Sequence, residues 1–374
     1  MTQQPNAPLI DIIAGARPNF MKIAPIMRAL ELRRAAGSPL RTRLVHTGQH
    51  YDARMSGDFF VQLGIPQPDV NLEVGSGTQA EQTAGIMTKY EHLLLSAPSD
   101  LCLVVGDVTS TMACAIAAQK LRIPVAHVEG GIRSGDWSMP EEINRLVTDA
   151  IANWFFTTST VANQNLRNSG VAEGRIFFVG NTMIDTLLAN MARLQPPQFW
   201  AAAALQPRGY FVMTLHRPAN VDDPAGFARL LAAVAQSTRG LPVVFPVHPR
   251  TAKTLASLPA LPPGLLVVDP QPYLEFNHLV RHAMAVITDS GGVTEETTVM
   301  GVPCVTLRDT TERPETVAVG TNELLGTDPA ALKPAMDRLF AGQWKKGSVP
   351  ELWDGLAGER IAATLERLLT PTRP

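Results

Sequence analysis

Acidic side chains directly follow two apolar runs in the first half of the chain, and carboxylates placed in this way can donate and accept protons. Asp107 comes after residues 101–105, and Glu129 comes after residues 124–128. Because the ends of neighbouring parallel strands meet at one edge of a sheet, both acids are expected in one pocket suited to acid–base catalysis. Asp107 could instead cap the next helix, whereas a buried glutamate at a strand end has no comparable structural explanation.

Two further acids, Glu141 and Glu142, stand at the start of a predicted helix. Acidic residues favour a helix start through the helix dipole, which is the structural alternative for both. Taken together with Asp107 and Glu129, Glu141 is a third candidate for moving protons.

The segment Ser290-Gly291-Gly292 has the composition of a phosphate-binding turn. It follows the apolar run 285–288 and precedes a predicted helix. Two glycines let an anion approach the backbone, and the N–H groups at a helix start point toward it. A tight turn with Ser290 as the helix cap is the alternative. A Walker loop is excluded because no Lys-Ser or Lys-Thr follows the glycines.

Cationic side chains also follow apolar runs, where they could meet a diphosphate. Arg17 and Lys22 come after residues 9–14, while Arg308 and Arg313 belong to a charged segment behind a later run. An arginine can bind a diphosphate through two hydrogen bonds at once. The structural alternatives are a solvated charged loop and a proline-opened helix with an exposed lysine.

Histidines end two apolar runs in the second half of the chain. His216 follows residues 210–214, and His248 follows residues 242–247. A lone histidine is usually structural, but two at equivalent strand ends facing a shared cleft carry more weight as candidates for catalysis.

Two other patterns are weak. His46 and His50 have the spacing of a metal-binding pair, but they span a strand end and a loop rather than a helix, so metal binding is disfavoured. Residues 75–80 fit the dinucleotide pattern G-x-G-x-x-A, yet residues 70–74 before them make a poor buried strand. They are interpreted as a loop that opens a helix from Thr78.

Short β-branched runs alternate with longer amphipathic stretches along the chain, which predicts an α/β fold with two doubly wound, Rossmann-like parallel sheets. A Pro- and Ala-rich stretch at 196–209 is the predicted linker between domains 1–195 and 210–355. A helix within 356–374 is expected to pack back on the first domain.

The composition excludes several classes of protein. The chain has 374 residues, 32 basic and 34 acidic, so it lacks the positive charge of a nucleic-acid binder. No apolar run is long enough for a membrane span, and no signal peptide is recognisable at the start. Three scattered cysteines favour buried thiols in a reducing compartment. A cytoplasmic enzyme of two domains is therefore expected.

A set of motifs occurs in a characteristic order. The motifs are Gly15-Ala16-Arg17-Pro18 with Lys22, Thr47-Gly48-Gln49-His50, Gly106-Asp107, His127-Val128-Glu129, Pro140-Glu141-Glu142-Ile143-Asn144-Arg145, Val179-Gly180-Asn181, His216-Arg217, Thr288-Asp289-Ser290-Gly291-Gly292 and Arg308-Asp309-Thr310-Thr311-Glu312-Arg313-Pro314-Glu315. With these motifs, over about residues 10–320, the chain closely resembles the non-hydrolysing UDP-N-acetylglucosamine 2-epimerases.

This resemblance implies a glycosyltransferase-B-like fold, with UDP bound mainly by the second domain and the sugar in a cleft between the domains. It implies reversible conversion of UDP-N-acetylglucosamine (UDP-GlcNAc) to UDP-N-acetylmannosamine (UDP-ManNAc) without a metal or NAD. The pathway would be elimination of UDP to 2-acetamidoglucal and re-addition. A homodimer that supplies cell-surface polysaccharide synthesis is also implied.

The resemblance assigns roles to residues position by position. The catalytic residues would be Asp107, Glu129, Glu141 and His216. The substrate-binding residues would be Arg17, Lys22, Phe276, Ser290, Gly291, Gly292, Glu296 and Arg313. Within that second set, Glu296 would bind the ribose hydroxyls and Phe276 would lie near the uracil, while the remaining residues would contact the diphosphate or line the active site.

Some bacterial members of this family carry a second, activating UDP-GlcNAc site. Gln49 matches that site, but Asp52 and Ser76-Gly77 stand where those members have a glutamine and an Arg-Gln pair. We therefore expect the rate curve for UDP-ManNAc to begin linearly, with no increase on adding a trace of UDP-GlcNAc.

Four other functions stay open on the sequence. One is C2 epimerisation of a modified UDP-sugar such as a diacetamido-uronic acid, which needs a cation for its C6 carboxylate. A hydrolysing epimerase that releases ManNAc and UDP is the second. The others are a sugar-nucleotide-binding regulator without activity and an NAD-dependent epimerase that binds its cofactor at the Gly75 loop.

Overall fold

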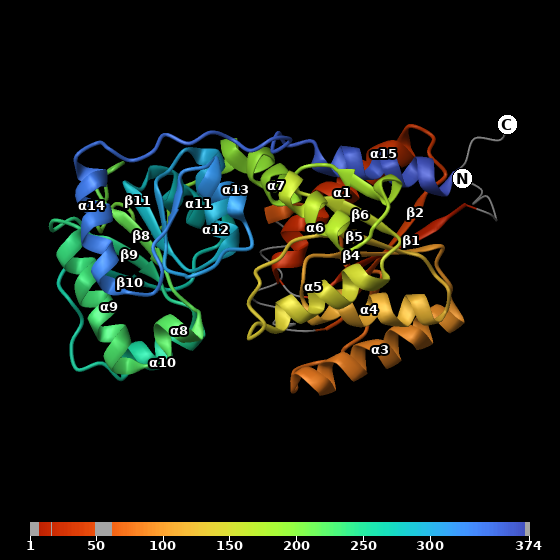
Figure 1. Ribbon diagram of the computed structural model, residues 1–374, viewed down its shortest axis with the longest axis horizontal. Helices are drawn as coiled ribbons and strands as arrows, with labels where there is room; N and C mark the ends of the chain where they lie inside the picture. Colours follow the sequence, from red (N-terminus) through yellow and green to blue (C-terminus); the bar gives the residue numbers. More distant parts are fainter. Residues whose placement is uncertain (1–6, 16, 49–61, 371–374) are drawn as a thin grey trace. The chain divides into compact units, whose positions relative to one another are not determined.

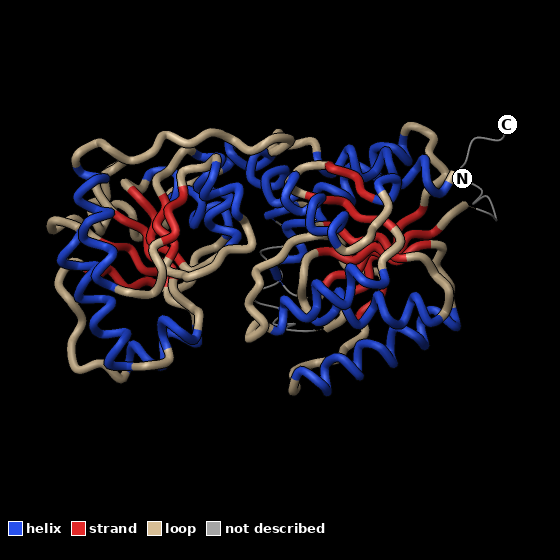
Figure 2. The backbone as a smooth tube through the Cα atoms, in the orientation of Figure 1, coloured by secondary structure: helices blue, strands red, loops and turns tan. Residues whose placement is uncertain are grey.

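The computed structural model describes residues 7–15, 17–48 and 62–370. The chain divides into two compact units, the first formed by Met1–Ala189 with Glu351–Pro374 and the second by Asn190–Pro350. In each unit, helices flank a central parallel sheet (Figures 1 and 2). The predicted α/β class with two doubly wound parallel sheets is confirmed.

The first sheet is parallel throughout. Within the described residues its strands pair in the order β3-β2-β1-β4-β5-β6-β7. The strands are β1 Leu9–Ala14, β2 Arg41–His46, β3 Val70–Asn71, β4 Leu101–Val105, β5 Val125–Val128, β6 Trp154–Thr157 and β7 Ile176–Phe178. The helices of this unit are α1 Arg17–Ala35, α3 Gln79–Ser96, α4 Thr109–Lys120, α5 Pro140–Ile151, α6 Thr160–Asn168, α7 Thr182–Asn190 and α15 Ala357–Leu369, with a 3-10 turn at Glu173–Arg175.

Burial on both faces explains why the central strands are continuously apolar. All five residues of β4 are buried. Cys102 and Val104 of this strand pack with Tyr90 of α3 and Ala113 of α4 in one core cluster. The N-terminus of α3 is fixed by Thr78, whose side chain accepts from the Glu81 N–H in a capping box, as expected for a loop that opens a helix there.

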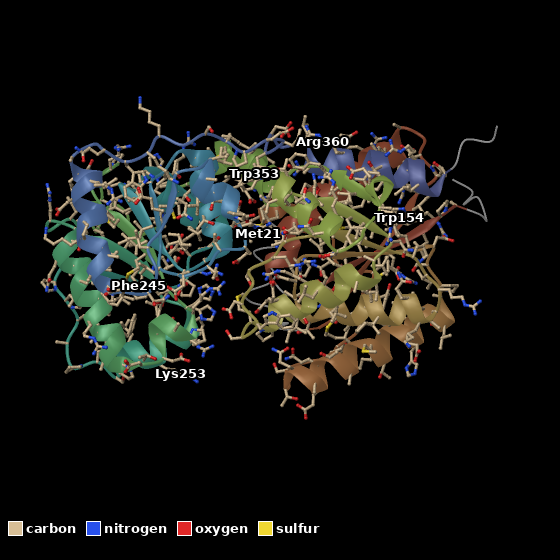
Figure 3. All side chains as sticks on the ribbon, in the orientation of Figure 1. Met21, Trp154, Phe245, Lys253, Trp353 and Arg360 are labelled. Atoms are coloured by element: carbon tan, nitrogen blue, oxygen red, sulfur yellow. The ribbon has the colours of Figure 1, made fainter. Side chains whose placement is uncertain are left out.

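The C-terminal segment returns to the first unit. Arg33 of α1 binds Glu359 at 2.5 Å and Glu366 at 2.7 Å, both on α15. Just before α15, Trp353 is buried and donates through Nε1 to the Thr158 carbonyl at 3.0 Å. Within α15, Arg360 donates to the Val179 carbonyl at 3.0 Å (Figure 3). Residues far apart in the sequence thus close one domain.

The second sheet is also parallel, and its described strands pair in the order β10-β9-β8-β11-β12-β13. The strands are β8 Phe211–Thr214, β9 Val243–Pro246, β10 Leu265–Val268, β11 Ala285–Thr288, β12 Cys304–Thr306 and β13 Asn322–Leu324. The helices are α8 Pro218–Val221, α9 Pro224–Ser237, α10 Pro249–Ala256, α11 Tyr273–His282, α12 Gly291–Met300, α13 Pro314–Ala318 and α14 Leu332–Phe340, with 3-10 turns at Met191–Arg193 and Pro329–Ala331.

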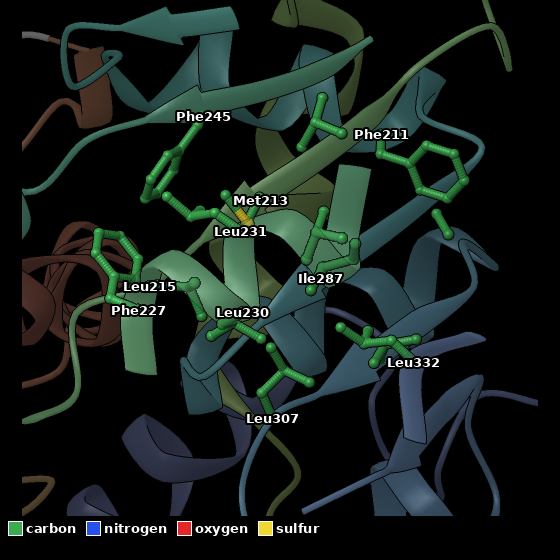
Figure 4. Packing of buried hydrophobic residues seen from close by; sticks show 14 of the residues in the cluster. Phe211, Met213, Leu215, Phe227, Leu230, Leu231, Phe245, Ile287, Leu307 and Leu332 are labelled. Carbon is green, nitrogen blue, oxygen red and sulfur yellow. The ribbon is translucent and has the colours of Figure 1, made fainter. Parts of the chain in front are cut away.

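Alternate residues of one strand serve the two faces of this sheet. Phe211 and Met213 of β8 pack with Leu230 of α9 in one cluster (Figure 4). The intervening Val212 packs with Leu279 of α11 in the cluster on the opposite face. This period of two is the geometry of a strand with both faces covered.

The predicted linker region belongs to the second unit. Leu205 is buried in its core, and Trp200 packs against that core with its ring edge-on to Tyr210 at 5.5 Å. The free thiols of Cys102, Cys114 and Cys304 are all buried, as expected from the sequence. None of the described helices has the length and apolar character needed to cross a bilayer.

Candidate active site

Each sheet reverses its strand order at one point, and doubly wound sheets bind ligands beyond the carboxyl ends of the strands at that point. The reversal lies between β1 and β4 in the first sheet and between β8 and β11 in the second. Most of the predicted site residues follow these strands or β5, so each unit carries its own cluster of candidates.

Glu129 follows β5 in a backbone conformation that few side chains adopt. Its φ is +71°, which costs a residue other than glycine roughly 1–3 kcal/mol. The side chain is 4% exposed, and Oε2 accepts from Lys22 Nζ at 2.8 Å. Gly106 lies against this pair, since a Cβ there would stand 3.1 Å from Lys22 Nζ and 3.8 Å from Glu129 Oε2. A strained, buried carboxylate beside a cation is typical of a functional position.

Asp107, the neighbour of Gly106, is held by the start of α5. Arg145 binds Asp107 Oδ2 at 2.5 Å with one nitrogen and Glu142 Oε2 at 2.7 Å with another. Asn144 Nδ2 donates to the Asp107 carbonyl at 2.8 Å. Because Arg145 is buried, this arrangement fixes both the backbone and the carboxylate of Asp107.

The two adjacent glutamates of α5 have different surroundings. Glu142 is buried and accepts from the N–H groups of Ser134 at 2.9 Å and Gly135 at 3.0 Å. Burial opposes its ionisation, but these bonds and Arg145 lower the pKa of Glu142. Glu141 is half-buried, and its side chain makes no hydrogen bond or ion pair with another described residue. Glu142 is therefore a structural anchor, and the catalytic role predicted for Glu141 stays a prediction.

The start of α1 is joined to β4 at the point where the strand order reverses. Asn19 accepts from the Gly15 N–H at 3.2 Å and donates to the Val105 carbonyl at 2.9 Å. Lys22, one turn later in the helix, thereby reaches Glu129. The helix begins at Arg17, whose side chain lies outside the described part of the structure.

His216 lies between β8 and α8 in the second unit, where its ring meets a buried aspartate. Nδ1 is 2.9 Å from Asp289 Oδ1, and the same carboxylate accepts from the Arg217 N–H at 2.9 Å and from Asn220 Nδ2 at 3.0 Å. Burial opposes ionisation, yet these hydrogen bonds hold the pKa of Asp289 below its usual value. An ionised Asp289 requires a proton on Nδ1 of His216, which leaves Nε2 for chemistry. The His216 side chain is 43% exposed.

Ser290 and Gly291 open α12 as expected of an anion-binding turn. Ser290 is the N-cap, and no side chain caps the helix start. Its own N–H donates to Thr288 Oγ1 at 3.0 Å. A Cβ on Gly291 would come within 2.6 Å of Glu312 Oε1, so a side chain here would meet that carboxylate. The uncapped first turn leaves N–H donors to stabilise an anion.

Glu312 brings two arginines to the start of α12. Its carboxylate binds Arg308 at 2.5 Å and lies 3.6 Å from Arg217. Although burial opposes ionisation, Arg308 lowers the pKa of Glu312 to about 2. Arg308 NH1 is buried without a hydrogen-bond partner among the described residues. The charges of two arginines and one glutamate leave a net positive charge beside the turn.

The remaining predicted binding residues lie deeper in this unit. Arg313 is buried and pairs with Glu295 at 2.6 Å. Glu296 is buried next to Asn277, and burial raises the pKa of Glu296 to about 7 despite hydrogen bonds from Asn277 and Tyr273. Phe276 of α11 is partly buried against the core. Their predicted contacts with the diphosphate, ribose and uracil stay predictions.

Several predicted features of the first unit lie wholly or partly outside the described residues. Gln49, His50 and Asp52 are not described, so the pairing of His46 with His50 and the activating site are untested. His46 is described, and it is buried and stacked on Phe20 with 5.5 Å between ring centroids. Burial lowers the pKa of His46.

Sequence reasoning missed the side chains that hold the predicted groups. Arg145, Asp289 and Glu312 stand inside the motifs that carry the resemblance, but they were given no role. His127 was quoted only as the start of a motif. It is fully buried between Asp149 and the Gly106 carbonyl. The sequence signal for these residues is that each belongs to a motif near the end of a strand. That signal does not show which groups each side chain contacts.

Comparison with known proteins shows the family of this chain. The family model described as UDP-N-acetylglucosamine 2-epimerase matches residues 32–366. The UDP-N-acetylglucosamine 2-epimerase of Methanocaldococcus jannaschii is 38% identical over 369 residues, covering 95% of this chain and 98% of the relative. The UDP-2,3-diacetamido-2,3-dideoxy-D-glucuronate 2-epimerase of Pseudomonas aeruginosa is 40% identical over 359 residues, covering 95% and 99% respectively.

A solved structure gives the same result. The crystal structure of the M. jannaschii UDP-GlcNAc 2-epimerase in complex with UDP-GlcNAc and UDP superposes with a TM-score of 0.84 at 38% identity, covering 96% of this chain and 99% of that one. Fold and relatives therefore define a sugar-nucleotide isomerase of the Rossmann-like, glycosyltransferase-B-like class. The chain belongs to the UDP-N-acetylglucosamine 2-epimerase family.

Proposed function

We propose that this chain catalyses the reversible C2 epimerisation of UDP-GlcNAc to UDP-ManNAc. One observation carries the proposal: in each sheet, the groups that this reaction needs lie at or next to the point where the strand order reverses. In the first unit these are Asp107 and Glu129, each held by a mostly buried cation. In the second they are His216, paired with Asp289, and the uncapped start of α12. Carboxylates suit proton transfer at carbon, and cations with N–H groups suit a departing diphosphate.

The reaction divides between the two clusters. A carboxylate of the first unit removes the C2 proton, and its loss is coupled to departure of UDP because the C2 hydrogen is only weakly acidic. The C1–O bond breaks with its electron pair going to UDP, which leaves 2-acetamidoglucal with a C1=C2 double bond. Re-addition returns the diphosphate oxygen to C1 in its original configuration and a proton to the opposite face of C2.

His216 and the start of α12 would act on the leaving group. With Nδ1 donating to the ionised Asp289, Nε2 is the nitrogen that can hydrogen-bond the diphosphate or relay a proton. The first N–H groups of α12, beginning at Gly291, would stabilise the charge that develops on UDP.

The test is incubation with UDP-GlcNAc in deuterated water, followed by NMR of the C2 position. Solvent deuterium at C2 together with formation of UDP-ManNAc is the expected result. Stoichiometric release of UDP and free ManNAc would instead identify a hydrolysing enzyme. Neither exchange nor product would contradict the proposal.

The relative from P. aeruginosa, 40% identical to this chain, favours a second candidate substrate, a UDP-diacetamido-uronic acid. The difference between the substrates is a carboxylate at C6 and an acetamido group at C3. Parallel measurement of kcat/KM on both UDP-sugars decides between them, and we expect the larger value for UDP-GlcNAc. The predicted homodimer is checked on the same preparation by light scattering.

A further inference from the structure

His127 is a buried histidine with acceptors at both ring nitrogens. It lies in β5, two residues before Glu129, and is 0% exposed. Nδ1 is 2.7 Å from Asp149 Oδ1 on α5, and Nε2 is 2.8 Å from the carbonyl oxygen of Gly106 after β4. The ring therefore connects β5 with α5 and with the residue after β4, next to Asp107 in the chain.

These two partners determine where the protons of His127 lie. A carbonyl oxygen only accepts, so Nε2 donates to Gly106. Asp149 also accepts from the Gly131 N–H at 2.9 Å and from Arg133 at 2.6 Å. Although burial opposes ionisation, His127 and Arg133 hold the pKa of Asp149 below its usual value. An ionised Asp149 also only accepts, so Nδ1 must donate as well. Only the imidazolium form donates from both nitrogens.

The carbonyl that accepts from His127 belongs to a critical turn. Gly106 has φ +70°, joins β4 to Asp107, and lies against both Lys22 Nζ and Glu129 Oε2. A displacement of this carbonyl would therefore move Asp107 relative to the Glu129–Lys22 pair. Shifts of about 1 Å in such groups can reduce turnover about 100-fold.

We propose that His127 is a positioning residue: as an imidazolium anchored by Asp149, it holds the Gly106 carbonyl and so sets Asp107 beside Glu129 and Lys22. The charged groups that face this arrangement are Arg133 against Asp149 and Arg145 against Asp107. The protonation of His127 is independent of what the enzyme does. Its effect on turnover rests on the proposed function.

The protonation is tested directly by NMR of the full chain labelled with ¹⁵N at the histidine rings. The His127 signals are assigned by their loss in His127→Asn. At about pH 7.5, where an ordinary histidine is mostly neutral, both His127 nitrogens are expected to carry protons. A neutral tautomer pattern at that pH would overturn the proposal, whatever the activity of the enzyme.

Two amide variants separate the two hydrogen bonds of the ring. His127→Gln places its amide nitrogen near Nε2 and keeps the bond to Gly106, whereas His127→Asn places it near Nδ1 and keeps the bond to Asp149. We expect kcat on UDP-GlcNAc to fall about 100-fold in His127→Asn with KM nearly unchanged, and no more than about tenfold in His127→Gln.

Thermal unfolding of both variants shows whether they keep the fold, and the wild-type NMR result stands even if they do not. Equal losses of kcat in two folded variants would overturn positioning through Gly106. If the wild-type chain instead exchanges no deuterium into UDP-GlcNAc, the proposed function has failed while the NMR result remains valid.

Discussion

The carboxylates of the two units are held in contrasting ways. At the edge of the first sheet, Glu129 and Asp107 each bind a cation that is itself mostly buried, Lys22 or Arg145. At the edge of the second sheet, the carboxylate of Asp289 accepts hydrogen bonds from backbone and side-chain N–H groups and is fully buried next to His216. The first arrangement holds its acids in fixed positions beside cations, whereas in the second the acid is buried and a histidine is exposed.

This contrast suits two halves of one elimination. Under the proposed function, removal of a proton from carbon needs a base whose position is fixed, and the paired cations would fix Glu129 and Asp107. Departure of a diphosphate is assisted by hydrogen-bond donors, which His216 and the start of α12 would supply. Variants in each cluster test whether the two clusters divide the reaction in this way.

The largest effect is expected for Glu129→Gln, which removes the buried acid but keeps its size. We expect kcat on UDP-GlcNAc to fall about 10²–10⁴-fold, because general acid–base groups contribute about that much. Exchange of C2 hydrogen with deuterated water should fall in parallel. The matched control is Glu351→Gln, an exposed glutamate in the first unit, which should keep full activity. Normal exchange in Glu129→Gln would remove Glu129 from proton transfer.

A somewhat smaller loss is expected for His216→Asn in the second unit. The histidine would assist the leaving diphosphate, so kcat should fall about 100-fold while UDP, measured by calorimetry, still binds. His248→Asn is the matched control: its ring centroid lies 6.0 Å from that of His216, and burial, His216 and Arg250 lower the pKa of His248. His248 follows β9, away from the strand reversal, and its replacement should cost less than tenfold. Equal losses in the two variants would contradict the special position of His216.

The turn before α12 should affect binding more than turnover. In Gly291→Ala, the added Cβ would meet Glu312 Oε1 at 2.6 Å, and Arg308 holds that carboxylate in place. Either the Glu312 carboxylate or the turn must shift, and both contribute to the anion site, so we expect KM for the UDP-sugar and Kd for UDP to rise about tenfold. Gly174→Ala is the control, since nothing lies within 4 Å of a Cβ there. An unchanged Kd for UDP would argue against an anion site at α12.

The central strands could be predicted because burial on both faces leaves an unmistakable pattern. Residues 9–14, 101–105 and 285–288 are strands with the predicted bounds. The prediction missed β3, β7 and β13, which have two or three residues each and lie at the sheet edges. Such short strands are defined by pairing with a neighbour, and their own sequence carries little signal.

For the site, the chain order of strands and turns was enough to bring candidates to the correct edges. It did not show which charge pairs with which. Lys22 and Glu129 are 107 positions apart, and Arg313 pairs with Glu295 of the preceding helix. Such partners depend on how helices dock on the sheet, a three-dimensional property that strand-end position does not encode.

An effect on stability, and the one most specific to the second unit, is expected from Glu312→Gln when the free energy of unfolding is followed with pH. Arg308 lowers the pKa of Glu312 from about 4.5 to about 2, so the pair contributes stability that is fully present above the unfolded pKa and is lost as pH falls through about 2. A shift of that size corresponds to about 3 kcal/mol. The free energy of unfolding of wild type should thus fall toward that of Glu312→Gln between about pH 5 and pH 2, while the exposed Glu351→Gln follows wild type throughout. A constant difference between wild type and Glu312→Gln over that range would mean that Arg308 and Arg217 do not stabilise the ionised form of Glu312.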